Sequence, residues 1–175
     1  MSIDTKLVFC AAVNQLGHSG IQDFCTVLEL AKSIAKQQNP SVSKQALANA
    51  SGAWYAWLLV TIADQILREH QIEKVFLKLP NVTSLPCSRL YLPQLRALLD
   101  DFETKLNNIA DVNLVTSNPD FAIINKKNIA PQFIQQSITP EVLEGYDTAY
   151  KNYISTCSIN DLESFVGAKT SLRPD

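Results

Sequence analysis

The sequence predicts an α/β fold in which a small mixed sheet is flanked by helices. In the first half of the 175-residue chain, apolar residues recur at three- and four-residue intervals, which is typical of helices. The second half contains short apolar runs bounded by turn-forming residues, which are typical of strands. Further helical patterns follow Pro93 and Pro140 in this half. Helices that alternate with a few short strands indicate the α/β class.

The composition is that of one folded domain. Hydrophobic residues make up 46% and charged residues 18% of the chain, which excludes a disordered protein. The four cysteines and two histidines are too scattered in the sequence for a zinc site or a disulfide framework. The cysteines are therefore expected to be reduced thiols in a cytoplasmic protein. The apolar stretch 53–63 is shorter than the roughly 20 residues of a membrane span, and no secretion signal opens the sequence. The net charge of −2, taken alone, argues against a nucleic-acid partner.

Two helices are expected in the first half. One covers residues 21–37 and ends at Asn39-Pro40. The second has Ser43 as its N-cap and runs to about His70. Its predicted apolar face consists of Leu47, Ser51, Trp54, Tyr55, Leu58, Leu59, Ile62 and Ile66. Ala56 falls at the edge of this face, where a helix can project a polar group into a cleft.

The second half is expected to contain the sheet. Residues 74–80 alternate like a strand, and a helix begins at Pro93. Residues 112–116 and 121–125 read as two strands joined by a tight turn at 117–120. A helix from Pro140 to about residue 155 precedes a last strand at 162–169.

The candidate chemistry rests on Asp120 and Lys169. Considered separately, Pro119-Asp120 is an ordinary turn pair and Lys169 an ordinary solvent-facing lysine at a strand end. On neighbouring strands, however, the two side chains can face one cleft. A carboxylate is a hard oxygen ligand suited to Mg²⁺, and an ammonium group can steady a water nucleophile or a phosphate that gains negative charge. This is the minimal equipment for hydrolysing a phosphodiester.

Several segments resemble one known family. Ser117-Asn-Pro-Asp120 with Lys169, which follows Asp120 by 49 positions, is similar to the PD…K active-site pattern of type II restriction endonucleases. Lys169-Thr-Ser-Leu-Arg-Pro-Asp175 resembles the K-x-S-L-R-P-D-R segment of their CCGG-core group within the PD-(D/E)xK superfamily. Three further stretches are similar to the same group in the same order: 52–57, 77–82 and 114–120. The resemblance runs from about residue 50 to Asp175.

The resemblance implies a role for each site residue. Asp120 and the backbone carbonyl of Ala168 would hold Mg²⁺, and Lys169 would orient the attacking water. Arg173 would donate two hydrogen bonds to guanine in the major groove, and Asp175 would accept one from cytosine. Without the resemblance, we would interpret Arg173 and Asp175 as a charged tail.

The sequence departs from the family pattern at Ala56. The family motif G-x-W-(Y/F)-E places a glutamate there, as a conditional second carboxylate of the metal site, and alanine offers no oxygen ligand. We favour the interpretation of an inactivating substitution; the alternative is a natural alanine packed against a neighbour.

A second departure concerns the residues after Asp175. The family's second recognition arginine would directly follow Asp175, and another metal-site glutamate would come about a dozen residues after Lys169. The expectation is therefore a fragment whose C-terminal part is missing, including much of the basic DNA-contacting sequence.

The resemblance implies an Mg²⁺-dependent enzyme that cleaves double-stranded DNA at a palindromic site with a CCGG core. A palindrome implies a two-fold symmetric homodimer or a tetramer. Residues 1–175 are expected to form one endonuclease domain, with a helical part at 1–72 and a catalytic core at 73–175. Two alternatives stay open: a non-catalytic DNA-binding module on the same fold, and a helical interaction protein in which Asp120 and Lys169 are unrelated surface groups.

Overall fold

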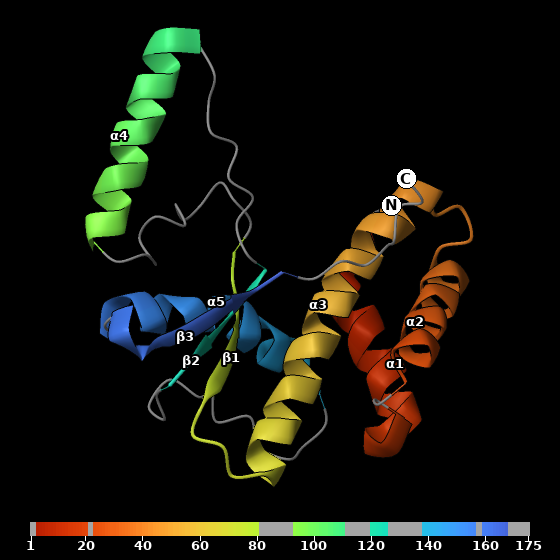
Figure 1. Ribbon diagram of the computed structural model, residues 1–175. Helices are drawn as coiled ribbons and strands as arrows, with labels where there is room; N and C mark the ends of the chain where they lie inside the picture. The colour runs from red at the N-terminus through yellow and green to blue at the C-terminus, as the bar shows by residue number, and fades with distance from the viewer. Residues whose placement is uncertain are drawn as a thin grey trace.

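The computed structural model describes residues 3–20, 23–80, 93–110, 120–125, 138–156 and 159–167. Three helices come first in the chain: α1 (Thr5–Gly20), α2 (Phe24–Gln38) and α3 (Lys44–Glu69). Helix α3 lies between the other two helices and the sheet (Figure 1). The predicted helices at 21–37 and 43–70 are thus confirmed as α2 and α3, whereas α1 was not predicted as a separate element.

Local capping sets where α2 and α3 begin. The Asp23 carboxylate accepts hydrogen bonds from the backbone N–H groups of Cys25 and Thr26, 3.0 and 3.2 Å away. The Ser43 hydroxyl accepts one from the N–H of Ala46 at 3.1 Å. These side chains satisfy N–H groups that the first turn of a helix cannot pair internally. Ser43 is therefore the N-cap of α3, as its sequence position predicted.

The sheet has three described strands: β1 (Val75–Lys78), β2 (Phe121–Ile124) and β3 (Leu162–Val166). Their order is β1-β2-β3, and each pair is antiparallel. Phe121 lies opposite Lys78 of β1 and Val166 of β3. The α/β class is confirmed, as are strands within the predicted ranges 74–80, 121–125 and 162–169. The predicted strand at 112–116 and its turn lie outside the described residues.

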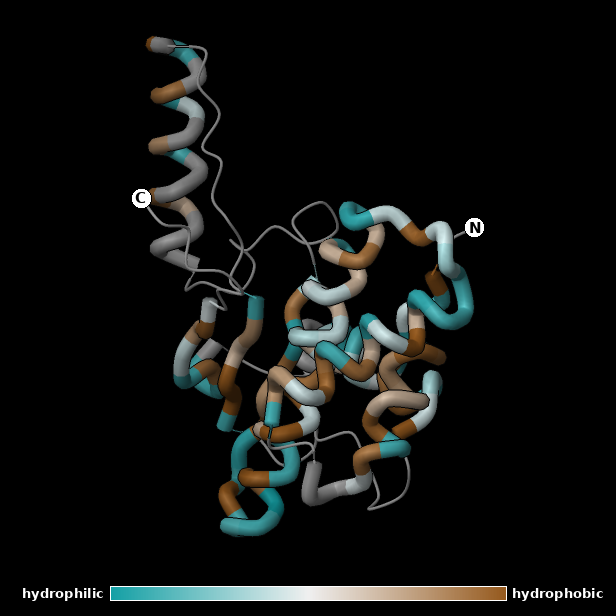
Figure 2. The backbone as a smooth tube through the Cα atoms, turned by 90° about the vertical axis from the view of Figure 1, so that its right-hand side faces the viewer, coloured by the Kyte–Doolittle hydropathy of each residue, from teal (hydrophilic) through white to brown (hydrophobic). Residues whose placement is uncertain are grey.

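Helices α4 (Pro93–Ala110) and α5 (Pro140–Thr156) begin at the two prolines that predicted them. A short 3₁₀ turn, η3 (Ile159–Asp161), leads from α5 to β3. Helix α5 contacts β1, α1 and α3, whereas α4 packs on none of the described elements to a comparable extent. Accordingly, α4 stands apart from the other helices in Figures 1 and 2.

Two clusters of buried side chains form the core. The larger one joins α1, α2, α3 and α5 to one face of the sheet through Phe121. The smaller one covers the opposite face and consists of Val75, Leu77, Leu79, Ala122, Ile124 and Ala149. Paired residues share a face of an antiparallel ladder, so β2 alternates between the two clusters. Burying both faces positions the sheet firmly against the helices.

The environment of α3 differs from the single predicted apolar face. Trp57, Val60 and Thr61 are buried although they lie outside that face, and Ile66, which belongs to it, is 46% exposed. The reason is that α3 has neighbours on two sides, with α1 and α2 on one and β1 and α5 on the other. Helix α3 is also the one described helix that is long and apolar enough to cross a membrane by length and composition alone. A core helix that is packed on two sides meets the same criterion.

Candidate active site

Asp120 lies at the end of the sheet, directly before β2. Its backbone carbonyl accepts a hydrogen bond of 2.9 Å from the N–H of Leu79, which follows β1. The next residue, Phe121, is 1% exposed, and its ring stacks on that of Phe76 with centroids 4.9 Å apart. The exposed Asp120 is therefore held through its own main chain and through the buried residue beside it.

Strand β3 ends beside Asp120. Its last residue, Val166, pairs with Phe121, and Gly167 follows directly. Strand β2, which begins directly after Asp120, and strand β3, which precedes Lys169 in the sequence, are therefore neighbours. The predicted residues Ala168, Lys169, Arg173 and Asp175 lie outside the described residues, so their roles stay predictions.

Ala56 is half-buried near the middle of α3. One turn further along the helix, Val60 is 2% exposed, and one turn earlier Gly52 is exposed. Apart from its own helix backbone and chain neighbours, a Cβ placed on Gly52 would meet no atom of the described residues within 4 Å. Helical side chains lean toward the N-terminus, so a longer side chain at position 56 would extend toward the exposed Gly52. Ala56 thus lies at the boundary between the core and the surface, as its helical position predicted.

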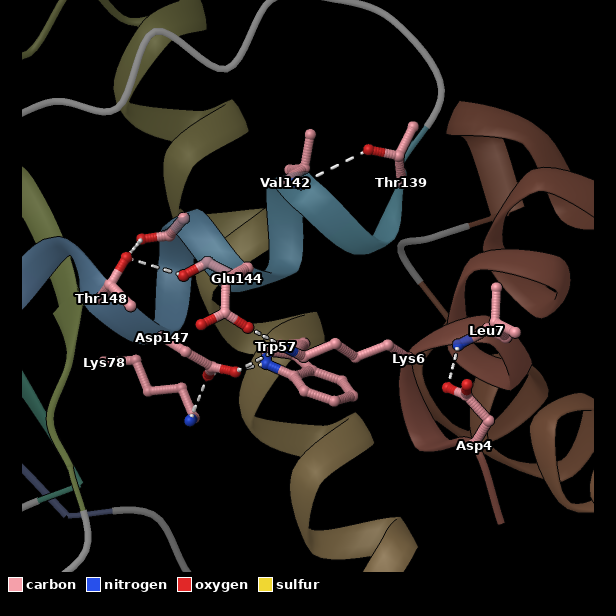
Figure 3. A network of polar contacts seen from close by, with 11 residues as sticks. Asp4, Lys6, Leu7, Trp57, Lys78, Thr139, Val142, Glu144, Asp147 and Thr148 are labelled. Carbon is pink, nitrogen blue, oxygen red and sulfur yellow. Dashed lines mark hydrogen bonds and ion pairs between the residues drawn. The ribbon is translucent and has the colours of Figure 1, made fainter.

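A polar cluster links this part of α3 to the end of the sheet (Figure 3). The indole N–H of Trp57, the residue after Ala56, donates to Asp147 Oδ1 of α5 at 3.0 Å. Lys78 Nζ of β1 donates to the same oxygen at 2.5 Å. Lys78 pairs with Phe121, which directly follows Asp120. These contacts therefore connect the turn of α3 that carries residue 56 with the strand that begins after Asp120.

Helix α1 joins this cluster through Lys6. Its ammonium group lies 3.8 Å from Asp147 Oδ2 and also forms an ion pair with Glu144. The hydrogen bond that Lys6 donates to Glu144 raises the pKa of Lys6 above its ordinary value, against the opposing effect of partial burial. The cluster therefore contains two cations and two carboxylates, all held between α1, α5 and β1.

The donor set at this end of the sheet suits Mg²⁺ only in part. Among the described residues, no group of three or more His, Cys, Asp or Glu side chains could hold a metal ion. Asp120 offers one carboxylate, and Ala56 offers none. Mg²⁺ commonly binds one or two carboxylates, substrate phosphate oxygens and several waters. One aspartate together with the phosphate oxygens of a bound ligand is therefore a donor set that Mg²⁺ accepts.

Residues 15–175 match the family model described as Cfr10I/Bse634I restriction endonuclease. The chain belongs to this family. It is 29% identical over 164 residues to the type II restriction enzyme Cfr10I of Citrobacter freundii, a match that covers 90% of this chain and 55% of that enzyme.

Two solved structures of Bse634I share the fold. The type IIF restriction endonuclease Bse634I with cognate DNA aligns at a TM-score of 0.66 and 24% identity, covering 88% of this chain and 55% of that one. A second Bse634I structure aligns at a TM-score of 0.65 and 24% identity, covering 87% and 55%. The chain thus spans about half the length of these relatives.

Sequence reasoning missed the cluster around Asp147. Lys78 and Asp147 are separated by 69 positions, and no local pattern pairs them. The one available signal was Trp57, which stands inside the family-like segment 52–57 and whose buried indole N–H needs an acceptor.

Proposed function

We propose that this chain is part of a type II restriction endonuclease that hydrolyses phosphodiester bonds in double-stranded DNA. The proposed target is a palindromic site with a CCGG core, and the proposed cofactor is Mg²⁺. The observation that carries the proposal is the antiparallel pairing of β2 with β3 beside Asp120. Membership of the Cfr10I/Bse634I family supports the same function.

The register of this pairing favours a shared site for Asp120 and Lys169. Phe121 pairs with Val166 and Ala122 with Phe165, so one further step would pair Asp120 with Gly167. Residues two apart on a strand share a face, and diagonal neighbours lie about 7–8 Å apart. Lys169, two residues after Gly167, would then face the same side as Asp120.

Each residue has a distinct proposed role. The Asp120 carboxylate and the Ala168 carbonyl are the metal ligands. A bound Mg²⁺ would supply Lewis-acid activation of a water and of the scissile phosphate. Lys169 orients that water by hydrogen bonding and offsets the negative charge that develops on the phosphate.

Base recognition is assigned to the residues after Lys169. Arg173 reads guanine through paired donors to O6 and N7, and Asp175 accepts from the cytosine amine. The relative Bse634I has been solved with cognate DNA, which supports DNA as the partner. A palindromic target requires a two-fold arrangement, so we propose a homodimer or a tetramer in the cytoplasm of a prokaryote. We also propose that residues 1–72 and 73–175 act as the helical and catalytic parts of one endonuclease domain, within a longer protein.

Ala56 favours a second candidate function: a DNA-binding module with little or no cleavage. A site with one carboxylate fewer binds Mg²⁺ more weakly, and DNA can then stay bound uncut. Gly52, one turn earlier on α3, is exposed, which supports a test with glutamate at position 56.

The test compares the wild-type protein with Ala56→Glu on supercoiled DNA that contains CCGG sites, in the presence of MgCl₂. We expect cleavage by Ala56→Glu at least about 100-fold faster than by the wild type, in line with the loss of one electrostatic contact in other enzymes. The double variant Ala56→Glu/Asp120→Asn is the matched control and should be inactive. The same comparison is then repeated in the longer protein of which this chain is proposed to be a part.

Absence of cleavage by Ala56→Glu, both in the 175-residue chain and in the longer protein, would overturn the nuclease assignment. Retained binding of CCGG duplexes by fluorescence anisotropy would then support the DNA-binding module.

A further inference from the structure

Asp147 is the point where four elements of the fold meet. Its carboxylate, on α5, accepts hydrogen bonds from Trp57 of α3 and Lys78 of β1 and lies 3.8 Å from Lys6 of α1. Its side chain is 24% exposed, so these contacts are partly shielded from water. Charge-assisted hydrogen bonds in such surroundings are stronger than neutral ones.

The contacts of Asp147 lead to both halves of the candidate site. On one side, Trp57 directly follows Ala56 and is 3% exposed, so its indole ring fixes the turn of α3 that carries position 56. On the other side, Lys78 pairs with Phe121, and the next N–H along the chain, that of Leu79, binds the carbonyl of Asp120.

We infer that Asp147 is a positioning residue that holds the Asp120 end of the sheet against the segment of α3 that carries residue 56. It acts through Trp57 and Lys78. Its carboxylate faces two cations and one N–H donor, a set that suits structural pairing rather than metal binding. The catalytic meaning of this role rests on the proposed function.

The chain offers a matched control for this inference. Trp54 and Trp57 are both buried in α3, and each donates one indole hydrogen bond of about the same length. Trp54 donates to the backbone carbonyl of Thr5 in α1, away from the sheet, at 2.9 Å. Trp57→Phe and Trp54→Phe therefore each remove one buried hydrogen bond, but only the first breaks a contact of Asp147.

The experiment measures amide hydrogen exchange by NMR in the full 175-residue chain. The Leu79 N–H reports on the Asp120 end of β2, and the Asn125 N–H, which binds the carbonyl of Asp161 at 2.7 Å, reports on the other end. In Asp147→Ala and in Trp57→Phe, we expect exchange at Leu79 to rise at least tenfold relative to Asn125. In Trp54→Phe, we expect that ratio to stay within about twofold of the wild type. Lys78→Arg should preserve it, and Lys78→Met should not.

A second readout connects the inference to the site. Mn²⁺ added alone should broaden the Phe121 amide signal, and the concentration needed should rise at least threefold in Trp57→Phe but not in Trp54→Phe. Equal changes at Leu79 and Asn125 in every variant would overturn the positioning role, because Asp147 would then stabilise the fold as a whole. Mn²⁺ broadening that Asp120→Asn does not remove would instead overturn the proposed metal site, while the exchange ratio still decides the role of Asp147.

Discussion

Helices α3 and α4 both carry apolar side chains at three- and four-residue intervals, yet their surroundings differ. In α3, Trp54 and Leu58 are fully buried between α1, α2 and the sheet. In α4, by contrast, Leu98, Phe102 and Ile109 are 66%, 52% and 83% exposed. In Figure 2, α4 accordingly stands apart from the other described elements. The comparison teaches that periodicity specifies a helix and its apolar stripe, whereas burial depends on surfaces contributed from elsewhere in the protein.

The largest expected effect is a direct test of this difference. Leu58→Ala should lower the free energy of unfolding by about 3 kcal/mol, because it leaves a cavity in a packed core. Leu98→Ala should change it by less than about 0.5 kcal/mol, because the leucine is already in water. Urea denaturation followed by circular dichroism measures both. Equal losses would mean that α4 is packed in solution.

The second effect concerns the buried thiol of Cys10 on α1. Burial, with a smaller contribution from Glu141, raises its pKa from 9.0 to about 11. Between these values the unfolded chain loses the thiol proton and the folded chain keeps it, so stability should fall as pH rises from about 9 to 11. The expected loss is about 1–2 kcal/mol.

Urea denaturation at pH 8 and pH 10.5 measures this loss. Cys10→Ala should remove this part of the pH dependence, whereas a matched change at the exposed Cys25 should leave it intact. An unchanged pH dependence in Cys10→Ala would show that the thiol is not shielded as the structure describes.

A smaller effect is expected at the start of α3. Ser43→Ala removes the acceptor of the Ala46 N–H and should cost about 1 kcal/mol. Ser33→Ala, at an exposed position inside α2, should be neutral or slightly stabilising because alanine is the better helix former. The two variants are compared by thermal unfolding. A neutral Ser43→Ala would indicate that packing alone defines where α3 begins.

The smallest effect is expected in α4. Lys105 and Asp101 form an exposed ion pair one turn apart, with N···O of 2.6 Å. A double-mutant cycle to alanine should give a coupling of about 0.3–0.5 kcal/mol that disappears in high salt. A coupling several times larger would place this pair in a protected contact and so weaken the contrast between the two helices.

Local chemistry in the sequence predicted much of the fold. Ser43 predicted the start of α3, and Pro93 and Pro140 predicted α4 and α5. Helix α1 was missed because Leu7 and Ala11 are apolar but exposed, so that in the sequence they hide the four-residue spacing of the buried Val8, Phe9, Ala12 and Val13. The two-sided burial of α3 was missed for a related reason: a helical wheel describes one element and cannot count its neighbours.

For the candidate site, the sequence predicted the position of Asp120 relative to the strands. Asp120 was placed at a strand end from its turn sequence, and its strand does pair with the strand that leads to Lys169. The roles assigned to Asp120, Ala56, Ala168, Lys169, Arg173 and Asp175 stay predictions. The role of Asp147 could not be predicted, because its contacts with Trp57 and Lys78 join residues 90 and 69 positions apart.

The register of β3 changes once along its length. Ile123 pairs with Ser164, but Ile124 pairs with Leu162, so the ladder contains an irregularity at the end remote from Asp120. A bulge of this kind absorbs an extra residue without disturbing the pairs beyond it. Length variation among homologues should therefore gather near Leu162, whereas a single insertion between Phe165 and Val166 would shift the pairing of β3 with Phe121 by one residue. The two ends of β3 should therefore differ in their tolerance of insertions.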